Sequence, residues 1–206
     1  MTISRHRHTY LIHDPGGHIG IPIAAGRPYE SKMLDHIYGL GLTGTALDVG
    51  AHVGNHALFL AAVCGLAVHA WEPGDRQYRM LVANIAANPT LDGRLHAQHL
   101  AAGDMPGTGT LNRLMQMIPG DGPACIARVD DVHDFDDLAV VKIDVEGGEP
   151  AALRGMAGHL RRCSPVVYTE VHGRSAHRAQ IAVLEPLGYQ ETARIKMGSL
   201  MLEWRR

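Results

Sequence analysis

Three carboxylates follow a predicted strand in the segment Asp144-Val145-Glu146-Gly147-Gly148-Glu149. The run 138–145 is almost wholly apolar and rich in β-branched residues, which is typical of a central parallel strand. In open α/β sheets, ligands bind just beyond the carboxyl ends of such strands. Because negative charge is expensive to bury, acids at this point predict either a cationic ligand or a proton-transfer role.

Side chains alternate along a strand, so Lys142, Asp144 and Glu146 fall on one side of it. We expect Asp144, at the strand end, to line a reaction site, where it orients the substrate or acts as its base. Glu146 is expected to bind substrate or to support a neighbouring loop. Glu149 falls in the first turn of the next helix, where it either complements the helix dipole or joins the site. Lys142 is expected to pair with a carboxylate, since an unpaired buried ammonium is costly.

A glycine loop connects a predicted strand to a predicted helix in the segment Leu47-Asp48-Val49-Gly50-Ala51-His52-Val53-Gly54-Asn55. Its glycines let a ligand approach the backbone, and the helix start at Asn55 offers free N–H groups. About twenty residues later Glu72 ends the second strand, where an acid can accept both hydroxyls of a ribose. We therefore expect a nucleoside-bearing cofactor that is bound by Asp48, Gly50, Ala51, His52, Gly54, Asn55, Glu72, Pro73 and Asp144.

The spacing of this loop discriminates between cofactors. A dinucleotide loop requires Gly-x-Gly-x-x-Gly, whereas here position 52 is His and the glycines stand four residues apart. The loop therefore suits a ligand without a pyrophosphate. S-adenosylmethionine (SAM) fits, because its amino acid part can meet the loop, its ribose can meet Glu72, and its sulfonium favours nearby carboxylates. A purely structural turn and a nicotinamide site are the alternatives.

His172 ends a later predicted strand and stands close in topology to Asp144. A histidine titrates near neutrality and is a natural base for a hydroxyl group. The alternative is a histidine that merely faces a loop. Asp144, Glu170 and His172 could also gather a divalent ion, as sets of carboxylate and imidazole ligands do. Their spacing does not require an ion, so no metal site is predicted.

These residues need a scaffold of alternating strands and helices, which the hydrophobic periodicity predicts. Strands are expected at 45–49, 66–71, 94–100, 126–129, 138–145 and 166–171, and helices at 28–40, 55–64, 75–87, 149–160 and 175–187. Segments 189–195 and 200–204 form a closing hairpin around Met197-Gly198. The pattern predicts an α/β fold: a doubly wound, mostly parallel, seven-stranded Rossmann-like sheet with a C-terminal antiparallel hairpin and helices on both faces.

Two segments stand outside this alternation. Residues 1–25 predict irregular structure or a short hairpin, with turn signals at Asp14-Pro15-Gly16-Gly17. The glycine- and proline-rich segment 101–123 predicts a loop or an edge hairpin, and its part 114–119 is either a mobile lid or an edge strand. Asp104 is a candidate acceptor for the amino group of adenine.

The composition excludes several classes of function. The 206 residues are enough for one domain with a sizeable core. The formal net charge is −2 and the basic residues are scattered, so no nucleic-acid partner is predicted. The longest apolar stretch, 57–68, is too short to span a bilayer. Three widely separated cysteines, Cys64, Cys125 and Cys163, do not suit a disulfide framework. We expect a soluble, cytoplasmic protein without a membrane partner.

Together these motifs resemble the FkbM-type methyltransferases, a family of class I SAM-dependent enzymes. The resemblance extends from about Tyr29 to Val171 and rests on Leu47 to Gly54, Trp71-Glu72-Pro73, Asn84, Asn88, Val129-Asp130-Asp131, Val141 to Glu149, Leu153 and Gly155. His52 departs from the family pattern, which usually has Asn there. Tyr29-Glu30 resembles the pair that begins the family's leading helix, so Glu30 is expected either to face the cofactor or to be solvated.

The resemblance implies a SAM-dependent O-methyltransferase that acts on a hydroxyl of a small molecule, a sugar or glycan, or a natural product. Residues 45–206 would form the SAM-binding domain, and residues 1–44 would cover the substrate and cofactor. Methyl transfer requires alignment of the acceptor and removal of its proton, for which Asp144, His172 and Glu146 are the catalytic candidates.

The sequence also leaves two rival functions and one oligomeric state open. An N-methyltransferase is the first rival, although the chain lacks the Pro-Pro motif that a subset of those enzymes carries after the fourth strand. A SAM-binding subunit without catalysis is the second. A homodimer is a further expectation.

Overall fold

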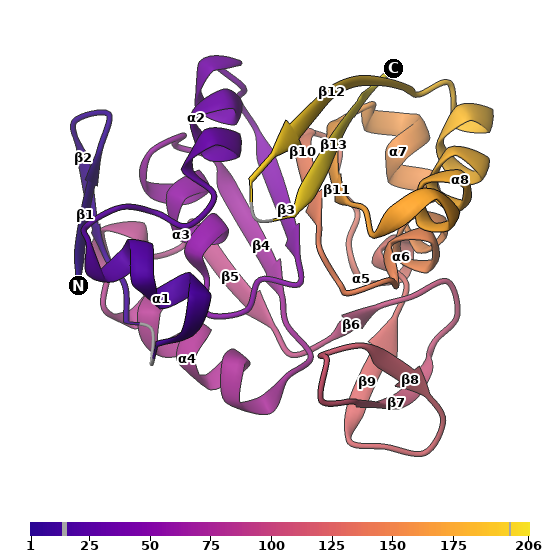
Figure 1. Cartoon of the computed structure of the whole chain (residues 1–206), viewed down its shortest axis with the longest axis horizontal. Coiled ribbons are helices and arrows are strands. Elements are labelled where there is room, and N and C mark those ends of the chain that lie inside the picture. The colour runs from indigo at the N-terminus through magenta and orange to yellow at the C-terminus, as the bar shows by residue number, and fades with distance from the viewer. Residues whose placement is uncertain (14–15, 198) are drawn as a thin grey trace.

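A seven-stranded sheet forms the centre of the computed structural model, which describes residues 1–13, 16–197 and 199–206 (Figure 1). Its strands, from edge to edge, are β12 (Gln190–Lys196), β13 (Leu200–Arg205), β11 (Val166–Glu170), β10 (Leu138–Ile143), β3 (Thr45–Val49), β4 (Ala67–Trp71) and β5 (Leu95–Gln98). Pairing is parallel from β11 to β5, and β13 is antiparallel to both of its neighbours. The predicted α/β class with a large central sheet is confirmed. The sheet is mixed, and its antiparallel pairings lie at the C-terminal hairpin.

The chain changes its direction across the sheet between β3 and β10. From β3 the chain proceeds outward through β4 and β5, whereas β10 and β11 lie on the other side of β3. The loops after the neighbouring strands β3 and β10 therefore run in opposite directions. A crevice opens between such loops at the carboxyl ends of the strands. The glycine loop after β3 and the acidic turn after β10 therefore face the same crevice.

Helices pack on both faces of the sheet because strand residues alternate between two cores. Ala46 and Val140 join one core with α2 (Ser31–Gly39), α3 (Asn55–Ala62) and α4 (Asp75–Ala86). Their neighbours Leu47 and Val141 join the other core, with α5 (Val129–Val132), α6 (Glu149–Gly155), α7 (Ala157–Cys163) and α8 (Gly173–Leu184). Burial of both faces explains why the central strands read as continuous apolar runs.

The helix predicted over 149–160 is wrong in one respect, because it forms two helices. Met156, between α6 and α7, has φ −124° and ψ 15°, outside the helical region. A Cβ on Gly155 would lie 1.9 Å from the carbonyl oxygen of Gly103. The chain thus bends where a glycine lets α6 pack directly against the backbone of another segment.

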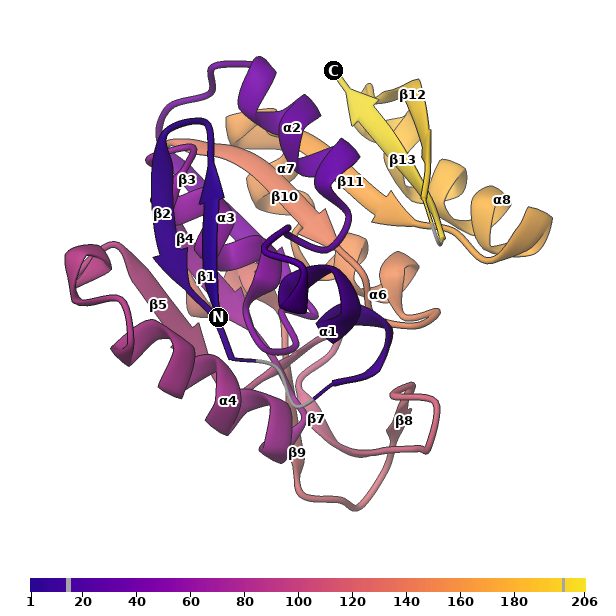
Figure 2. The same ribbon diagram turned by 60° about the vertical axis from the view of Figure 1, so that its left-hand side comes forward.

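The N-terminal segment contains more regular structure than predicted. The hairpin of β1 (Thr2–Arg5) and β2 (His8–Leu11) fits the expectation and lies beside α3 (Figure 2). Helix α1 (Gly17–Ala24) was not predicted, and it contains Pro22. The turn signals at Asp14 and Pro15 lie outside the described residues. The helix predicted over 28–40 begins only at Ser31, because Glu30 adopts a left-handed conformation with φ 55°.

Two buried asparagines, one in α4 and one just after it, hold this N-terminal segment in place by hydrogen bonds. The side chain of Asn84 accepts the N–H of His13 at 2.7 Å and donates to its carbonyl at 2.9 Å. Asn88 makes the same pair of bonds with Leu11, both at 2.7 Å. Side-chain amides thus satisfy backbone groups that the short β1–β2 hairpin leaves unpaired. The predicted division of the chain into a covering segment, residues 1–44, and a SAM-binding domain, residues 45–206, stays a prediction.

Segment 101–123 and the residues that follow it form a second, smaller sheet. Its strands, in spatial order, are β6 (Ala101–Ala102), β9 (Ala124–Ala127), β7 (Gly107–Leu111) and β8 (Met117–Pro119). A Cβ on Gly122 would lie 2.2 Å from the carbonyl oxygen of Gly109, so the glycine-rich composition reflects close backbone contact. The strand predicted at 126–129 ends earlier, because Val129 opens α5.

The remaining elements are short. Single 3-10 turns cover Pro89–Leu91 and Glu185–Leu187. The predicted C-terminal hairpin is present, although Gly198 in its turn lies outside the described residues. Cys64, Cys125 and Cys163 are free thiols. No helix within the described ranges is long and apolar enough to cross a bilayer. The cytoplasmic location and the homodimer stay predictions.

Candidate functional site

A pocket opens at the carboxyl ends of β3, β4, β10 and β11. Four groups of residues line it: the glycine loop, the ends of the neighbouring strands, an N-terminal group, and a group from the smaller sheet. They are Val49 to His52, Asn55, His56, Glu72, Pro73, Leu100 to Ala102, Lys142, Asp144 to Glu146, Gly148, Glu170, His18, Ile19, Tyr29, Leu111, Met115 and Met117. The pocket therefore gathers residues that are more than 150 positions apart in the chain.

Gly50 joins the glycine loop to the acidic turn. Its φ is 79°, and a Cβ there would lie 1.8 Å from the carbonyl oxygen of Asp144. The N–H groups of Gly50 and Ala51 both donate to the carbonyl of Trp71, at 2.9 and 3.0 Å. A glycine is thus required both by the left-handed backbone and by the close approach of the two loops.

Gly54 and Asn55, at the start of α3, act mainly on neighbouring structure. A Cβ on Gly54 would lie 2.8 Å from Leu81 of α4, so this glycine allows two helices to approach. The amide of Asn55 accepts the N–H of Tyr29 and donates to its carbonyl, both at 3.0 Å. Asn55 lines the pocket and also fixes Tyr29, which forms part of its wall.

Glu72 lies at the end of β4, with its carboxylate held by the backbone. One oxygen accepts the N–H of His52 at 2.8 Å and the other accepts the N–H of Gly74 at 2.7 Å. The residue is 3% exposed, and burial raises the pKa of its carboxyl group despite these bonds. The acid is therefore fixed in position at the pocket wall, beside Pro73.

Asp48 and Lys142 form a buried ion pair next to the pocket, and Lys142 forms part of its wall. Lys142 Nζ lies 3.2 Å from Asp48 Oδ1 and 3.6 Å from Asp144 Oδ2, and it donates to the carbonyl of Gly50 at 3.0 Å. Burial opposes the charge of Lys142, but the two carboxylates outweigh burial and raise its pKa. The pairing predicted for Lys142 is confirmed. Asp48, by contrast, pairs with Lys142 and is not among the residues that line the pocket.

Asp144 and Glu170 face each other from the ends of adjacent parallel strands. Asp144 follows β10 directly and is not its last residue, whereas Glu170 ends β11. Each of the two carboxyl groups affects the pKa of the other. Burial would raise the pKa of Asp144, but Lys142 and Glu170 hold it below its usual range. Burial and the charge of Asp144 raise the pKa of Glu170 to about 7.

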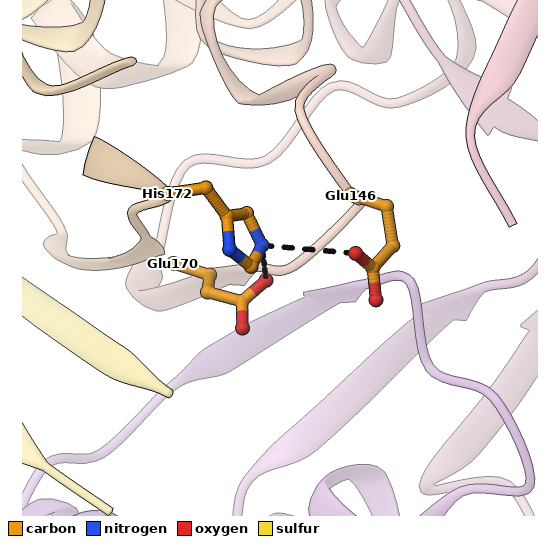
Figure 3. Close-up of side chains that lie close together, drawn as sticks. All are labelled: Glu146, Glu170 and His172. Atoms are coloured by element: carbon orange, nitrogen blue, oxygen red, sulfur yellow. Dashed lines mark hydrogen bonds and ion pairs between the residues drawn. The ribbon is translucent and has the colours of Figure 1, made fainter. Parts of the chain in front are cut away.

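His172 and Glu146 are about half exposed and lie near Glu170 (Figure 3). His172 Nε2 lies 2.7 Å from a carboxylate oxygen of Glu170 and 3.7 Å from one of Glu146. Burial lowers the pKa of the imidazole, but Glu170 outweighs burial and raises it. Burial and Asp144 raise the pKa of Glu146. His172 itself does not line the pocket in the described part of the chain, whereas Glu146 and Glu170 do.

The same three side chains could also hold a cation. One ligand atom from each of Glu146, Glu170 and His172 lies within 4.8 Å of the other two. Carboxylate and imidazole sets bind divalent ions. This set differs from the one considered from the sequence, because Glu146 takes the place of Asp144.

Glu149 belongs to the structure of the turn rather than to the pocket wall. It is buried at the start of α6, where one carboxylate oxygen accepts the N–H groups of Val145 and Gly147, each at 3.1 Å. The helix-start alternative therefore describes Glu149, with the addition that it holds the turn after β10. Glu30 is likewise buried and pairs with His56 at 3.0 Å, which excludes the solvated alternative.

Asp104 lies apart from these residues. Its carboxylate accepts a 2.7 Å bond from Arg154 Nε, both side chains are substantially exposed, and among the described residues it does not line the pocket. Its neighbours Ala101 and Ala102 do line it. The sequence motifs do not identify His18, Ile19 or His56 as site residues, because no local pattern marks them, although residues 1–44 are expected to cover the site.

Known proteins share this architecture. The sequence matches the methyltransferase FkbM domain over residues 48–191. No curated protein sequence matches the chain. Among solved structures, methyltransferase FkbM from Methylobacillus flagellatus has 20% identity and a TM-score of 0.62, with 78% of this chain and 43% of that chain covered. This chain therefore spans less than half the length of that protein.

Two further structures are similar over most of this chain. Fibrillarin from Aeropyrum pernix, which contains natively bound S-adenosyl-L-methionine, has 14% identity and a TM-score of 0.54, with coverage of 84% of this chain and 74% of that chain. Precorrin-6y C5,15-methyltransferase from Geobacter metallireducens has 13% identity and a TM-score of 0.57, with coverage of 91% and 97%. At such identities the likeness shows the fold alone. The domain match, which covers more than half of the sequence, shows that the chain belongs to the FkbM methyltransferase family.

Proposed function

We propose that this chain is a SAM-dependent O-methyltransferase whose acceptor is a hydroxyl group of a small molecule or a glycan. Family membership, together with the SAM bound in a fibrillarin of similar fold, indicates SAM as the cofactor. The observation that carries the hydroxyl acceptor is the pair of carboxyl groups, Asp144 and Glu170, in the pocket wall. A hydroxyl loses its proton on methylation, and a carboxylate with a pKa near neutrality can take it.

The residues at the glycine loop fit SAM. Gly50 has no side chain toward Asp144, so the loop presents backbone to the pocket next to Ala51 and His52. Each oxygen of Glu72 accepts one N–H and retains a lone pair, so the carboxylate can still accept ribose hydroxyls. Pro73 and Ala101 supply apolar wall on the same side, which suits a purine.

The acidic end of the pocket suits the reacting groups. When bound, SAM supplies a methyl group on a positively charged sulfur. Asp144 would stabilise that charge or orient the acceptor hydroxyl, and Glu146 and His172 would act at the outer side of the site. Apolar residues of the N-terminal segment and of the smaller sheet, such as Ile19 and Leu111, would limit the access of water to the site.

Other acceptors are separate outcomes of the test. A Pyrococcus horikoshii protein provisionally described as an RNA methyltransferase shares the fold, with 16% identity and a TM-score of 0.55. The net charge of −2 does not favour a polyanionic acceptor for this chain. Transfer to an amine, or cofactor binding without transfer, would correspond to the two rival functions.

Calorimetry with S-adenosylhomocysteine tests the cofactor. The folded protein is expected to bind it, and a folded protein that does not bind would contradict the proposal. Transfer from [methyl-³H]-SAM is then measured into small-molecule, glycan and total RNA fractions of a cell extract, followed by identification of the methylated atom. Label on oxygen in the first two fractions is expected, whereas label only in RNA or on nitrogen would support a rival.

The variant Asp144→Asn separates binding from turnover. It should lower turnover and spare the affinity for S-adenosylhomocysteine, because the carboxylate acts at the acidic end of the pocket. Asp134→Asn, whose side chain is 99% exposed and outside the pocket, is the matched control. Equal losses of binding and turnover in Asp144→Asn would show that this residue belongs to the cofactor site alone.

A further inference from the structure

We propose that Glu170 is the general base of this reaction and that the proton it takes leaves the pocket through His172. This inference rests on the proposed function and assigns roles within the same site. Glu170 carries the central role because it lines the pocket and is also hydrogen-bonded to His172.

The register of the sheet brings the two carboxyl groups together. Ile143 of β10 pairs with Thr169 of β11, so the residues that follow, Asp144 and Glu170, lie side by side where both strands end. Adjacent strands stand about 4.8 Å apart, which is within reach of two carboxyl groups on the same face. Two carboxylates this close repel each other, so ionisation of one raises the pKa of the other.

The charges around the pair decide which carboxyl group keeps the proton. From β10, Lys142 lies 3.6 Å from Asp144 and stabilises its ionised form. His56 of α3 also favours ionised Asp144, and Ser199 of the β12–β13 turn and His172 face Glu170. The proton therefore resides on Glu170 at low pH and leaves it near pH 7. Ionised Glu170 is then a base of suitable strength for a hydroxyl.

Glu170 is itself shielded from solvent, with a side chain that is 7% exposed. His172 bridges it to the outside: its Nε2 lies 2.7 Å from Glu170, and its side chain is 50% exposed. Glu146, 3.7 Å from the same nitrogen, stabilises the imidazolium that forms when the proton arrives. Glu170 and His172 thus form a path from the pocket to water, and Glu146 lies beside the same imidazole nitrogen (Figure 3).

The step balances without a further reactant. The acceptor's O–H bond breaks as its O–CH₃ bond forms, and the bond between methyl and sulfur breaks to leave a neutral sulfide. The proton passes from the acceptor oxygen to Glu170, then to His172 and to water. Asp144 keeps its charge throughout, which retains the electrostatic bias that returns Glu170 to its ionised form.

Carboxyl and imidazole titrations test the protonation of Glu170 without any acceptor. In ¹³C and ¹H NMR of the protein saturated with S-adenosylhomocysteine, one carboxyl signal should titrate near pH 7 and vanish in Glu170→Gln. In Asp144→Asn this midpoint should fall by at least one pH unit. The midpoint of His172 should fall in Glu170→Gln. A Glu170 midpoint below pH 6 in the wild type would overturn the proposal.

Turnover of the acceptor that the labelling assay identifies tests the relay. It is measured in buffer that contains EDTA, which removes any divalent metal ion. Glu170→Gln should lose about 10²- to 10⁴-fold in kcat, the usual range for a general base, with S-adenosylhomocysteine affinity within twofold. His172→Gln should lose about tenfold and regain activity with added imidazole. Asp134→Asn should match the wild type.

Two results would overturn the relay and leave the proposed function standing. One is a loss smaller than tenfold in Glu170→Gln. The other is wild-type turnover that stops in EDTA and returns with Mg²⁺ or Mn²⁺, since Glu170 and His172 would then be metal ligands that cannot pass a proton. A wild-type protein that neither binds S-adenosylhomocysteine nor transfers label would instead contradict the proposed function itself.

Discussion

Glu72 and Glu170 are the same residue type at comparable places, yet their surroundings differ. Both end parallel strands or follow them directly, both are buried, both line the pocket, and burial raises the pKa of both. The carboxylate of Glu72 accepts two backbone N–H groups, from His52 and Gly74. The carboxyl group of Glu170 instead faces two titratable side chains, Asp144 and His172.

This difference indicates how one fold supports two roles for an acid. Backbone N–H groups neither titrate nor rotate, so they hold Glu72 as a stationary hydrogen-bond acceptor. Side-chain partners exchange protons and change charge, so Glu170 can gain and lose one. The glycine-loop half of the pocket is therefore suited to binding, and the half formed by β10 and β11 is suited to chemistry.

Gly50→Ala should disrupt both halves of the pocket, because Gly50 lies where the glycine loop packs against the acidic turn after β10. A Cβ would collide with the backbone of Asp144 and would strain a left-handed residue. We expect the free energy of unfolding to fall by about 3 kcal/mol or more, from overpacking and strain together. Urea denaturation followed by the fluorescence of buried Trp71 and Trp204 measures this.

Gly93→Ala is the matched control for that substitution. Gly93 also has a positive φ, 69°, but a Cβ there has no neighbour within 4 Å. It should lose only the cost of the left-handed conformation, about 1 kcal/mol. Equal losses in the two variants would mean that the contact between the loops contributes nothing.

The pH dependence of stability should distinguish the chemical half. The pKa of Glu170 is about 7 in the folded protein and about 4.3 when unfolded, so the folded state holds the extra proton between these values. Stability should therefore fall as pH rises from about 4.3 through 7, by up to about 4 kcal/mol. Glu170→Gln should remove this fall relative to wild type and to Asp134→Asn. An unchanged slope in Glu170→Gln would count against the raised pKa of Glu170.

Glu72→Ala should affect the binding half. Loss of charge-assisted bonds to ribose costs about 1.5–3 kcal/mol, which corresponds to roughly 10- to 100-fold weaker binding of S-adenosylhomocysteine. Calorimetry measures the affinity, and Glu170→Gln serves as the contrasting variant, with affinity unchanged. If Glu72→Ala binds within twofold of wild type, the ribose role is wrong.

Asp104→Asn should have the smallest effect. It tests whether the binding half of the pocket extends as far as Asp104. Its partner is Arg154, and the pair is exposed, so its loss should change the free energy of unfolding by no more than about 1 kcal/mol. The affinity for S-adenosylhomocysteine should stay within twofold in the same calorimetric assay. A tenfold weakening would restore the predicted contact with adenine.

The elements of the fold were predictable where local pattern and tertiary packing agree. β3 matches its predicted range, and α4 and β11 differ from theirs by one residue at one end, because apolar periodicity and flanking glycines mark these elements. The break at Met156 and helix α1 were not predictable in this way. The first depends on a contact between Gly155 and the distant Gly103, and the second contains Pro22.

The residues of the candidate site divide along the same line. Glycine spacing, the position of Glu72 and the acids after an apolar strand are local features, so the sequence alone identified the cofactor class, the family and the strand ends that meet. The partners of those residues depend on register and strand order. Only the tertiary structure placed Lys142 between Asp48 and Asp144, moved Asp104 out of the pocket and showed that Glu149 holds the turn after β10, because hydrogen bonds and burial act between segments that are distant in the chain.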